Sequence, residues 1–151
     1  MKREEFEQLK ESSIGHSLIK AGRLYTDYSF TVLKESIGWG ELKPSHLQLF
    51  AYIPFEGITV IDLATKMKIS KQAVSVLVND LIEAKVFLKK SHPTDKRSFL
   101  ITFNEKGDRS IFKGMKLLKE LDDELELIVG KKNTKLVQSS LLKIIGALTK
   151  K

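Results

Sequence analysis

Two short, separately capped helices followed at once by two strand-like segments constrain the fold more than any other feature of the sequence. The run Thr59-Val60-Ile61-Asp62 resembles a helix-capping pattern and predicts the start of a short helix. Ser70 is a favourable N-cap for a second helix over about 71–84. Apolar residues at helical spacing predict the buried faces: Leu63, Ala64 and Met67 in the first helix, and Val74, Leu77, Val78 and Leu81 in the second.

The two strand-like segments are residues 86–90 and 98–103, and the polar loop 91–97 separates them. Short β-prone segments joined by a polar loop are typical of a hairpin. A short helix, a turn and a capped second helix form a helix-turn-helix, and a hairpin directly after it is a wing. The order of elements therefore predicts a winged helix-turn-helix DNA-binding region over residues 42–103.

Helices are also predicted on both sides of this region. The first covers 4–36, with an interruption near Ser12-Ser13-Ile14-Gly15 and an end at Gly38-Trp39-Gly40. A shorter helix starts near Pro44 and stops before Pro54. After the wing, Asn104 is the expected N-cap of a long helix that ends at Gly130, and a last helix covers about 132–149.

These flanking helices carry more apolar surface than one chain of this size can bury. The expected inward residues of the two C-terminal helices are Ile111, Met115, Leu118, Leu121, Leu125, Ile128, Leu136, Val137, Leu141, Ile144, Ile145 and Leu148. A second copy of the chain is the simplest partner for such faces. We therefore predict a mainly α fold with a small β-hairpin wing. It forms a single domain over 1–151, in which 4–36 and 105–149 are dimerisation helices.

Composition narrows the function classes. The chain has no cysteine, which removes disulfides, thiolate metal sites and thiol chemistry. Residues 60–100 hold eight basic and four acidic residues, more than half of the net charge of +7. A basic segment of this kind favours a polyanionic partner, although a basic solvated surface has the same composition. We expect no membrane span and no signal peptide, and hence a cytoplasmic location.

The outer face of the helix over 71–84 carries the candidate base contacts. If the apolar stripe faces the core, the opposite face presents Lys71, Gln72, Ser75, Val76 and Asn79. Gln and Asn bond adenine bidentately in the major groove, Val suits a thymine methyl, and Lys suits a phosphate. An ordinary amphipathic helix has a similar polar face, so the helix-turn-helix context supports the interpretation.

Several of these segments resemble the MarR family of transcription regulators, in order and over nearly the whole chain. The matching residues are Ile14-Gly15, Leu42-Lys43-Pro44-Ser45-His46, Leu63-Ala64, Ile69-Ser70-Lys71-Gln72-Ala73-Val74-Ser75, Leu81, Asp95-Lys96-Arg97-Ser98 and Asn104-Glu105-Lys106-Gly107. The resemblance implies that Arg97 enters the minor groove and that Asp95 holds its guanidinium in place. Asp95, Lys96 and Arg97 are therefore the candidate wing contacts. A polar hairpin turn with an incidental ion pair is the alternative.

Two positions depart from the family pattern. Lys85 stands where the family usually has Gly, and a left-handed Lys costs roughly 1–2 kcal/mol. Asn104 replaces the usual Thr, an exchange between two N-cap residues.

The remaining candidates concern ligands. His16, His46 and His92 lie in three different elements, so we expect surface or second-layer histidines and no metal site. No sequence motif indicates catalysis or a cofactor. His16, Lys20 and Arg23 share a helix face by their spacing. Because members of the family bind small phenolic or anionic ligands near such helices, this face is a candidate effector site, with a solvated basic face as the alternative.

Taken together, these residues predict a sequence-specific DNA-binding homodimer that represses transcription from a pseudo-palindromic operator. A small aromatic or anionic ligand would release it. The alternative is a winged-helix module that binds another protein and no longer binds DNA.

Overall fold

The computed structural model describes residues 2–38, 40–106 and 110–150. Trp39 of the predicted Gly38–Gly40 break and Gly107 of the predicted family segment lie outside these residues. The chain divides into two compact units, residues 1–114 and 115–151. The boundary between the two units falls inside one helix, α6 (Ile111–Val129). The organisation of the chain as a single domain stays a prediction.

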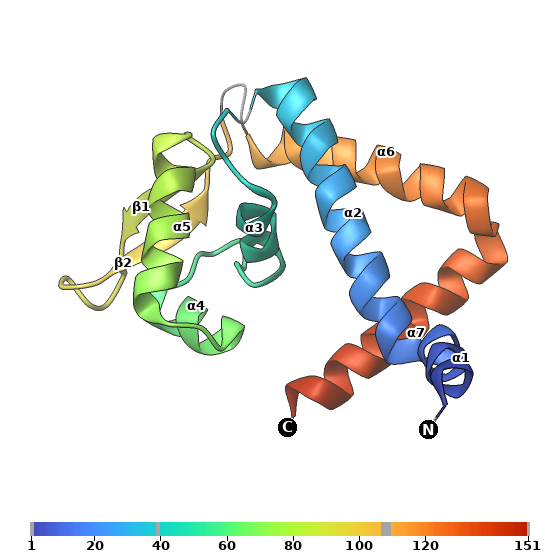
Figure 1. Cartoon of the computed structure of the whole chain (residues 1–151). Helices are drawn as coiled ribbons and strands as arrows, with labels where there is room; N and C mark the ends of the chain where they lie inside the picture. Colours follow the sequence, from blue (N-terminus) through green and yellow to red (C-terminus); the bar gives the residue numbers. More distant parts are fainter. Residues whose placement is uncertain (1, 39, 107–109, 151) are drawn as a thin grey trace. The chain divides into compact units, whose positions relative to one another are not determined.

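The predicted N-terminal helix is interrupted where the sequence indicated. Helix α1 covers Arg3–Ser12 and helix α2 covers Ile14–Ile37 (Figure 1). Ser13 makes the break because its extended backbone lets its hydroxyl accept the N–H of His16, at 3.2 Å. Helix α2 ends at Gly38, whose φ of 63° is the left-handed conformation that a terminal glycine adopts easily.

The predicted helix-turn-helix is confirmed. A short helix α3 (Pro44–Leu47) continues into a 3-10 turn η1 (Gln48–Ala51), and α4 (Val60–Met67) is followed by α5 (Lys71–Glu83). The hydroxyl of Thr59 accepts the N–H of Asp62 and that of Ser70 accepts the N–H of Ala73, both at 3.1 Å. Each predicted cap therefore satisfies a free donor of the first turn of its helix.

A small hydrophobic core joins these helices to the wing. Val74, Val78 and Leu81 of α5 are buried as predicted, while Leu77 is half-buried. Phe50, Phe87 and Phe103 pack with ring centroids 5.4–5.7 Å apart. Of the three rings only Phe87 is fully buried, and full burial of a side chain of this size stabilises a fold by about 1.5–3 kcal/mol. This core therefore holds α5 and the hairpin to one scaffold.

The wing is an antiparallel hairpin of β1 (Phe87–Ser91) and β2 (Phe99–Phe103), within one residue of the predicted start of each strand. Phe87 lies opposite Phe103, and Ser91 lies opposite Phe99. Ile58 adds a short bridge to Ile101 through two main-chain hydrogen bonds of 2.8 and 3.1 Å. The residue before this bridge, Gly57, has a φ of 97°, and a Cβ there would lie 2.6 Å from Cγ2 of Thr102. Only glycine fits this approach to the hairpin.

The predicted start of the long helix is wrong. Asn104 does not cap a helix, because α6 begins at Ile111. The amide of Asn104 donates to the carbonyl of Lys85 at 2.6 Å and accepts the N–H of Lys106 at 3.1 Å. Asn104 therefore ties the end of the wing to the turn after α5. Ser110 takes the capping position, accepting the N–H of Lys113 at 3.4 Å.

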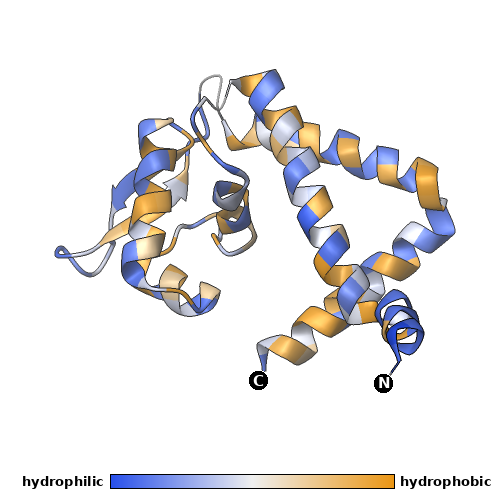
Figure 2. Cartoon of the chain, viewed as in Figure 1, coloured by the Kyte–Doolittle hydropathy of each residue, from blue (hydrophilic) through white to orange (hydrophobic). Residues whose placement is uncertain are grey.

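The second unit contains the remainder of α6 and helix α7 (Lys131–Thr149), with Gly130 between them at a φ of 84°. Apolar and polar residues alternate along both helices (Figure 2). Many apolar side chains remain open to solvent in the single chain: Leu125, Leu127, Ile128, Val129, Leu136, Val137, Leu142, Ile145 and Leu148. No helix among the described residues is long and apolar enough to cross a membrane.

Candidate nucleic-acid interface

The outer face of α5 presents the predicted base-reading side chains. Lys71, Gln72, Val76 and Asn79 are exposed and Ser75 is half-buried, while the opposite face of the helix is buried in the core. Val76 is 60% exposed, although it is a β-branched apolar residue. The face therefore combines amide groups with an uncovered methyl surface, which matches the hydrogen-bonding and methyl groups of the major groove.

Exposed cations accompany this face. They lie at the end of α4, at the start of α5, on β1 and in the wing loop: Lys66, Lys68, Lys71, Lys89, Lys90, Lys96 and Arg97. All belong to the unit that carries the helix-turn-helix. Positive side chains of this kind bind phosphates without reading sequence.

The wing loop is organised around Asp95, but not as the family resemblance implied. One oxygen of the Asp95 carboxylate accepts the main-chain N–H of Arg97 at 2.9 Å, and the other accepts the hydroxyl of Ser98. Within the described residues the structure shows no ion pair between Asp95 and the Arg97 guanidinium. Asp95 thus fixes the main chain from which Arg97 projects, and the exposed Arg97 side chain stays available to a partner.

Hydrogen bonding within the loop also lowers the pKa of the Asp95 carboxyl group. The hydroxyl of Ser98, and then the main-chain N–H of Arg97, hold the pKa of Asp95 below its ordinary value of 3.8, with a smaller contribution from His92. The Nδ1 atom of His92 accepts the N–H of Asp95 at 3.1 Å, which closes the other side of the turn. The loop is therefore ordered around a carboxylate that stays ionised at neutral pH.

The turn between α5 and β1 carries the departure from the family pattern. Lys85 has a φ of 59°, the left-handed conformation expected for the glycine that usually stands there. Its carbonyl is held by the Asn104 amide, and the N–H of Asn104 donates to the carbonyl of Val86 at 2.9 Å. The junction between the recognition helix and the wing is thus fixed by hydrogen bonds in spite of an unfavourable backbone conformation.

One polar contact of α5 could not be predicted from the sequence. Nε2 of His46, on α3, lies 2.9 Å from a carboxylate oxygen of Asp80 on α5. His46 is 2% exposed, so it is a second-layer histidine. The two residues are 34 positions apart, and neither the periodicity nor the caps of the sequence predict such a pairing.

The structure separates the predicted effector-binding residues. His16 and Lys20 line a hollow between α1 and α2 together with Glu7, Lys10 and Glu11. Charges of both signs therefore surround it, and Nζ of Lys10 lies 3.4 Å from a carboxylate oxygen of Glu7. Arg23 lines a different hollow, beside Pro44 and Gln48, and its Nε lies 3.9 Å from a carboxylate oxygen of Asp27. The three side chains share one face of α2 by their spacing, but they do not line one common cavity.

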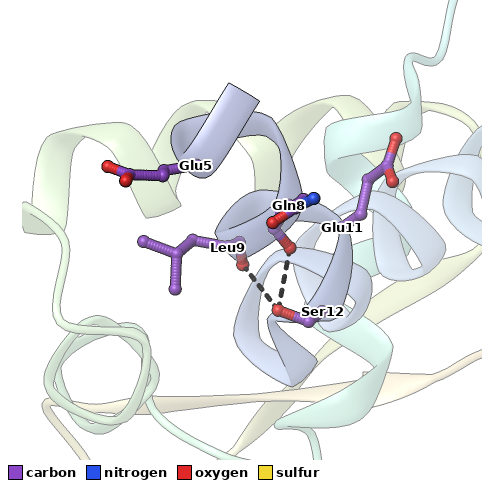
Figure 3. A pocket seen from close by; sticks show the side chains of 5 residues that line it. All are labelled: Glu5, Gln8, Leu9, Glu11 and Ser12. Carbon is purple, nitrogen blue, oxygen red and sulfur yellow. Dashed lines mark hydrogen bonds between the residues drawn. The ribbon is translucent and has the colours of Figure 1, made fainter. Parts of the chain in front are cut away.

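A third hollow lies along α1 and contains none of the predicted site residues (Figure 3). Glu5 and Glu11 make it acidic, and the hydroxyl of Ser12 donates to the carbonyls of Gln8 and Leu9, at 2.8 and 3.3 Å. The described residues contain no group of three or more His, Cys, Asp or Glu side chains placed to hold a metal ion.

A helix-turn-helix whose second helix exposes a polar face, followed by a hairpin with cationic side chains, defines a winged helix-turn-helix protein. Residues 41–98 match the sequence model of the MarR family. The resemblance to this family that the sequence indicates is confirmed over this segment. A search of curated proteins finds no significant match.

Solved structures share the fold along most of the chain. The transcriptional repressor CouR, bound to a 23-mer DNA duplex, is 21% identical with a TM-score of 0.65, and the match covers 91% of this chain and 95% of that one. A MarR transcriptional regulator from Methanosarcina mazei Go1 is 19% identical with a TM-score of 0.62, covering 91% and 96%. The complex of MepR from S. aureus with DNA is 14% identical with a TM-score of 0.65, covering 90% and 98%.

Proposed function

We propose that this chain is a homodimeric, sequence-specific double-stranded DNA-binding transcription regulator. The observation that carries the proposal is the exposed polar face of α5, where Gln72 and Asn79 lie on a helix that the fold holds as a recognition helix. The basic side chains around it supply the phosphate contacts that such proteins need. Two structural relatives, CouR and MepR, are bound to DNA in their solved structures, which supports the same role here.

Homodimerisation is the second part of the proposal. The uncovered apolar faces of α1, α6 and α7 favour a partner chain with the same surfaces. Two recognition helices would then occupy successive major grooves of a pseudo-palindromic operator, and the two Arg97 side chains would enter flanking minor grooves. A narrow minor groove favours Arg because of its enhanced negative potential.

Repression and release by a ligand complete the proposal. A dimer bound over a promoter would block transcription sterically, in the cytoplasm. A small aromatic or anionic ligand at His16 and Lys20, or near Arg23, would release the DNA by binding better to a dimer whose recognition helices are wrongly spaced. CouR is itself described as a transcriptional repressor, which supports the repressive role.

Selection of binding sites from random duplex DNA tests the proposal. The wild type is expected to return a pseudo-palindromic motif. Gln72→Ala or Asn79→Ala is expected to cost about 1–3 kcal/mol per lost contact and to relax the preference at defined positions. Gln138→Ala, which removes the same kind of side chain from an exposed position of α7, serves as the control.

Failure of the wild type to select any motif would contradict the proposal and favour the alternative, a winged-helix module that binds a protein. An unchanged motif and affinity in both α5 variants would show that another element reads the bases.

A further inference from the structure

A buried histidine connects the helix before the helix-turn-helix to the recognition helix. His46 lies on α3, and its ring is bonded at both nitrogens. The main-chain N–H of Lys43 donates to Nδ1 at 2.8 Å, and Nε2 lies 2.9 Å from Oδ2 of Asp80. His46 is almost fully buried, whereas the side chain of Asp80 is 46% exposed. The bond therefore runs from the interior of the fold to the edge of α5.

The hydrogen bonds determine the direction of this contact. A carboxylate only accepts hydrogen bonds, so Nε2 carries a hydrogen and donates it to Asp80. Nδ1 lies 2.8 Å from the main-chain nitrogen and 3.0 Å from the carbonyl oxygen of Lys43, so the main chain of Lys43 holds the other side of the ring. The ring cannot turn without breaking the bond to Lys43. The position of the Nε2–H donor is thus set by the main chain at the start of α3.

Asp80 occupies a sensitive place on α5. It directly follows Asn79 and comes one turn after Val76, both on the candidate base-reading face. The opposite face of α5 packs through Val74, Val78 and Leu81, whose apolar contacts are not directional. A hydrogen bond to a carboxylate is directional, and it weakens as its angle departs from linearity.

Small rotations of α5 matter for base recognition. At a side-chain radius of about 6 Å, a rotation of about 10° about the helix axis moves a side-chain tip by about 1 Å. A shift of this size takes a bidentate amide out of hydrogen-bonding distance of a base edge.

We propose that His46 and Asp80 are a positioning pair that sets the rotation of α5, so that Gln72 and Asn79 meet the base edges in register. The pair itself does not contact DNA bases. The inference rests on the proposed DNA-binding function and adds the residues that determine its specificity.

The test compares specific with non-specific DNA binding. Asp80→Ala removes the acceptor and a negative charge from a DNA-binding surface. Plain electrostatics predicts equal or tighter binding to both kinds of DNA. Positioning predicts instead that affinity for the wild-type motif falls while affinity for random duplex holds or rises, so that their ratio drops about tenfold, the equivalent of one lost base contact.

Two controls separate positioning from charge and from folding. Glu83→Ala removes the same charge from an exposed site three residues further along α5 and is expected to leave the ratio unchanged. Asp80→Asn keeps an acceptor oxygen for Nε2–H and is expected to restore the ratio to near the wild-type value. If Asp80→Ala does not fold, Asp80→Glu takes its place, because it keeps the charge and displaces the acceptor by about one methylene, or roughly 1.5 Å.

The outcomes are distinct. A wild type that selects a motif, with an unchanged ratio in Asp80→Ala and Asp80→Glu, overturns the positioning pair and leaves DNA recognition intact. An equal drop in Glu83→Ala also overturns it. A wild type that selects no motif removes the proposed function, and the positioning pair with it.

Discussion

Two lysines of the helix-turn-helix, Lys68 and Lys85, have left-handed backbone conformations, with φ of 55° and 59°. Lys68 ends α4 and Lys85 follows α5, so each terminates a helix where glycine would be less strained. The strained backbone of Lys85 lies between the recognition helix and the wing. The side-chain amide of Asn104 stabilises this conformation by donating a hydrogen bond to the carbonyl of Lys85. The sequence departs from the family pattern here, and Lys85 adopts a left-handed conformation in place of a glycine.

Replacing this lysine is expected to stabilise the protein. A left-handed Lys costs roughly 1–2 kcal/mol, and glycine gives back about 0.5–1 kcal/mol through its greater freedom in the unfolded chain. Lys85→Gly should therefore raise the free energy of unfolding by about 0.5–1 kcal/mol, measured by urea denaturation. Ala84→Gly, at a φ of −70°, should lower it by a similar amount. A loss of stability in Lys85→Gly would show that the lysine side chain stabilises the folded protein by more than its left-handed backbone conformation destabilises it.

The pKa of Asp95 provides a second test of a single residue. Since the Ser98 hydroxyl is the largest cause of the lowered pKa, Ser98→Ala should raise it toward 3.8. An NMR titration of the Asp95 carboxyl carbon measures the change, with Ser91→Ala as a control at the other end of the loop. An unmoved pKa would mean that the main-chain N–H of Arg97 alone holds the carboxylate.

The same pKa fixes the pH range in which the wing is ordered. A carboxyl whose folded pKa is depressed contributes its stability above the unfolded value of 3.8 and loses it as the pH falls through the lower folded value. The wing loop is therefore expected to keep its conformation across the neutral range.

At the level of single elements, the wing carries two side chains of opposite charge, Arg97 and Asp95, for which we expect different roles in DNA binding. If Arg97 enters the minor groove, Arg97→Ala should weaken binding. It should also reduce the slope of log K against log salt by about 0.9 for each lost contact, or about two units for two wings. Fluorescence anisotropy at several salt concentrations measures both quantities. Lys132→Ala, which removes the same charge from α7, should leave the slope unchanged.

Asp95→Ala distinguishes loop order from charge. The variant removes a negative charge near DNA, so electrostatics alone predicts tighter binding. In the structure, however, Asp95 holds the main chain of Arg97 and the hydroxyl of Ser98, and its loss frees the loop. We therefore expect weaker binding in the same anisotropy assay. Tighter binding would show that the loop order contributes nothing to DNA affinity.

At the scale of the whole molecule, the exposed apolar side chains of α7 predict the oligomeric state. Leu141→Glu together with Ile145→Glu should convert the dimer to a monomer, because two buried carboxylates cannot be paired in such an interface. Sedimentation velocity at micromolar concentration measures the change. Lys143→Glu, at an exposed position between them, should remain dimeric. A wild type that sediments as a monomer would remove homodimerisation from the proposal.

Local sequence signals determined the helix-turn-helix, the wing and the reading face of α5. Thr59, Ser70 and the stripe of Val74, Val78 and Leu81 act within one or two turns of their own helix, so periodicity and capping suffice to predict them. The same reasoning misplaced Asn104, since the residue that its amide binds, Lys85, lies 19 positions earlier in the chain.

The contacts between side chains that are distant in the sequence depend on how the elements pack in three dimensions. The tertiary structure paired His46 with Asp80, aimed Asp95 at the main chain of Arg97, and placed Arg23 in a different hollow from His16. A sequence pattern reports which face of an element is buried, because burial repeats with the period of that element. The partner of a polar side chain depends instead on how separate elements pack and on the direction of one hydrogen bond, and neither leaves a periodic trace in the sequence.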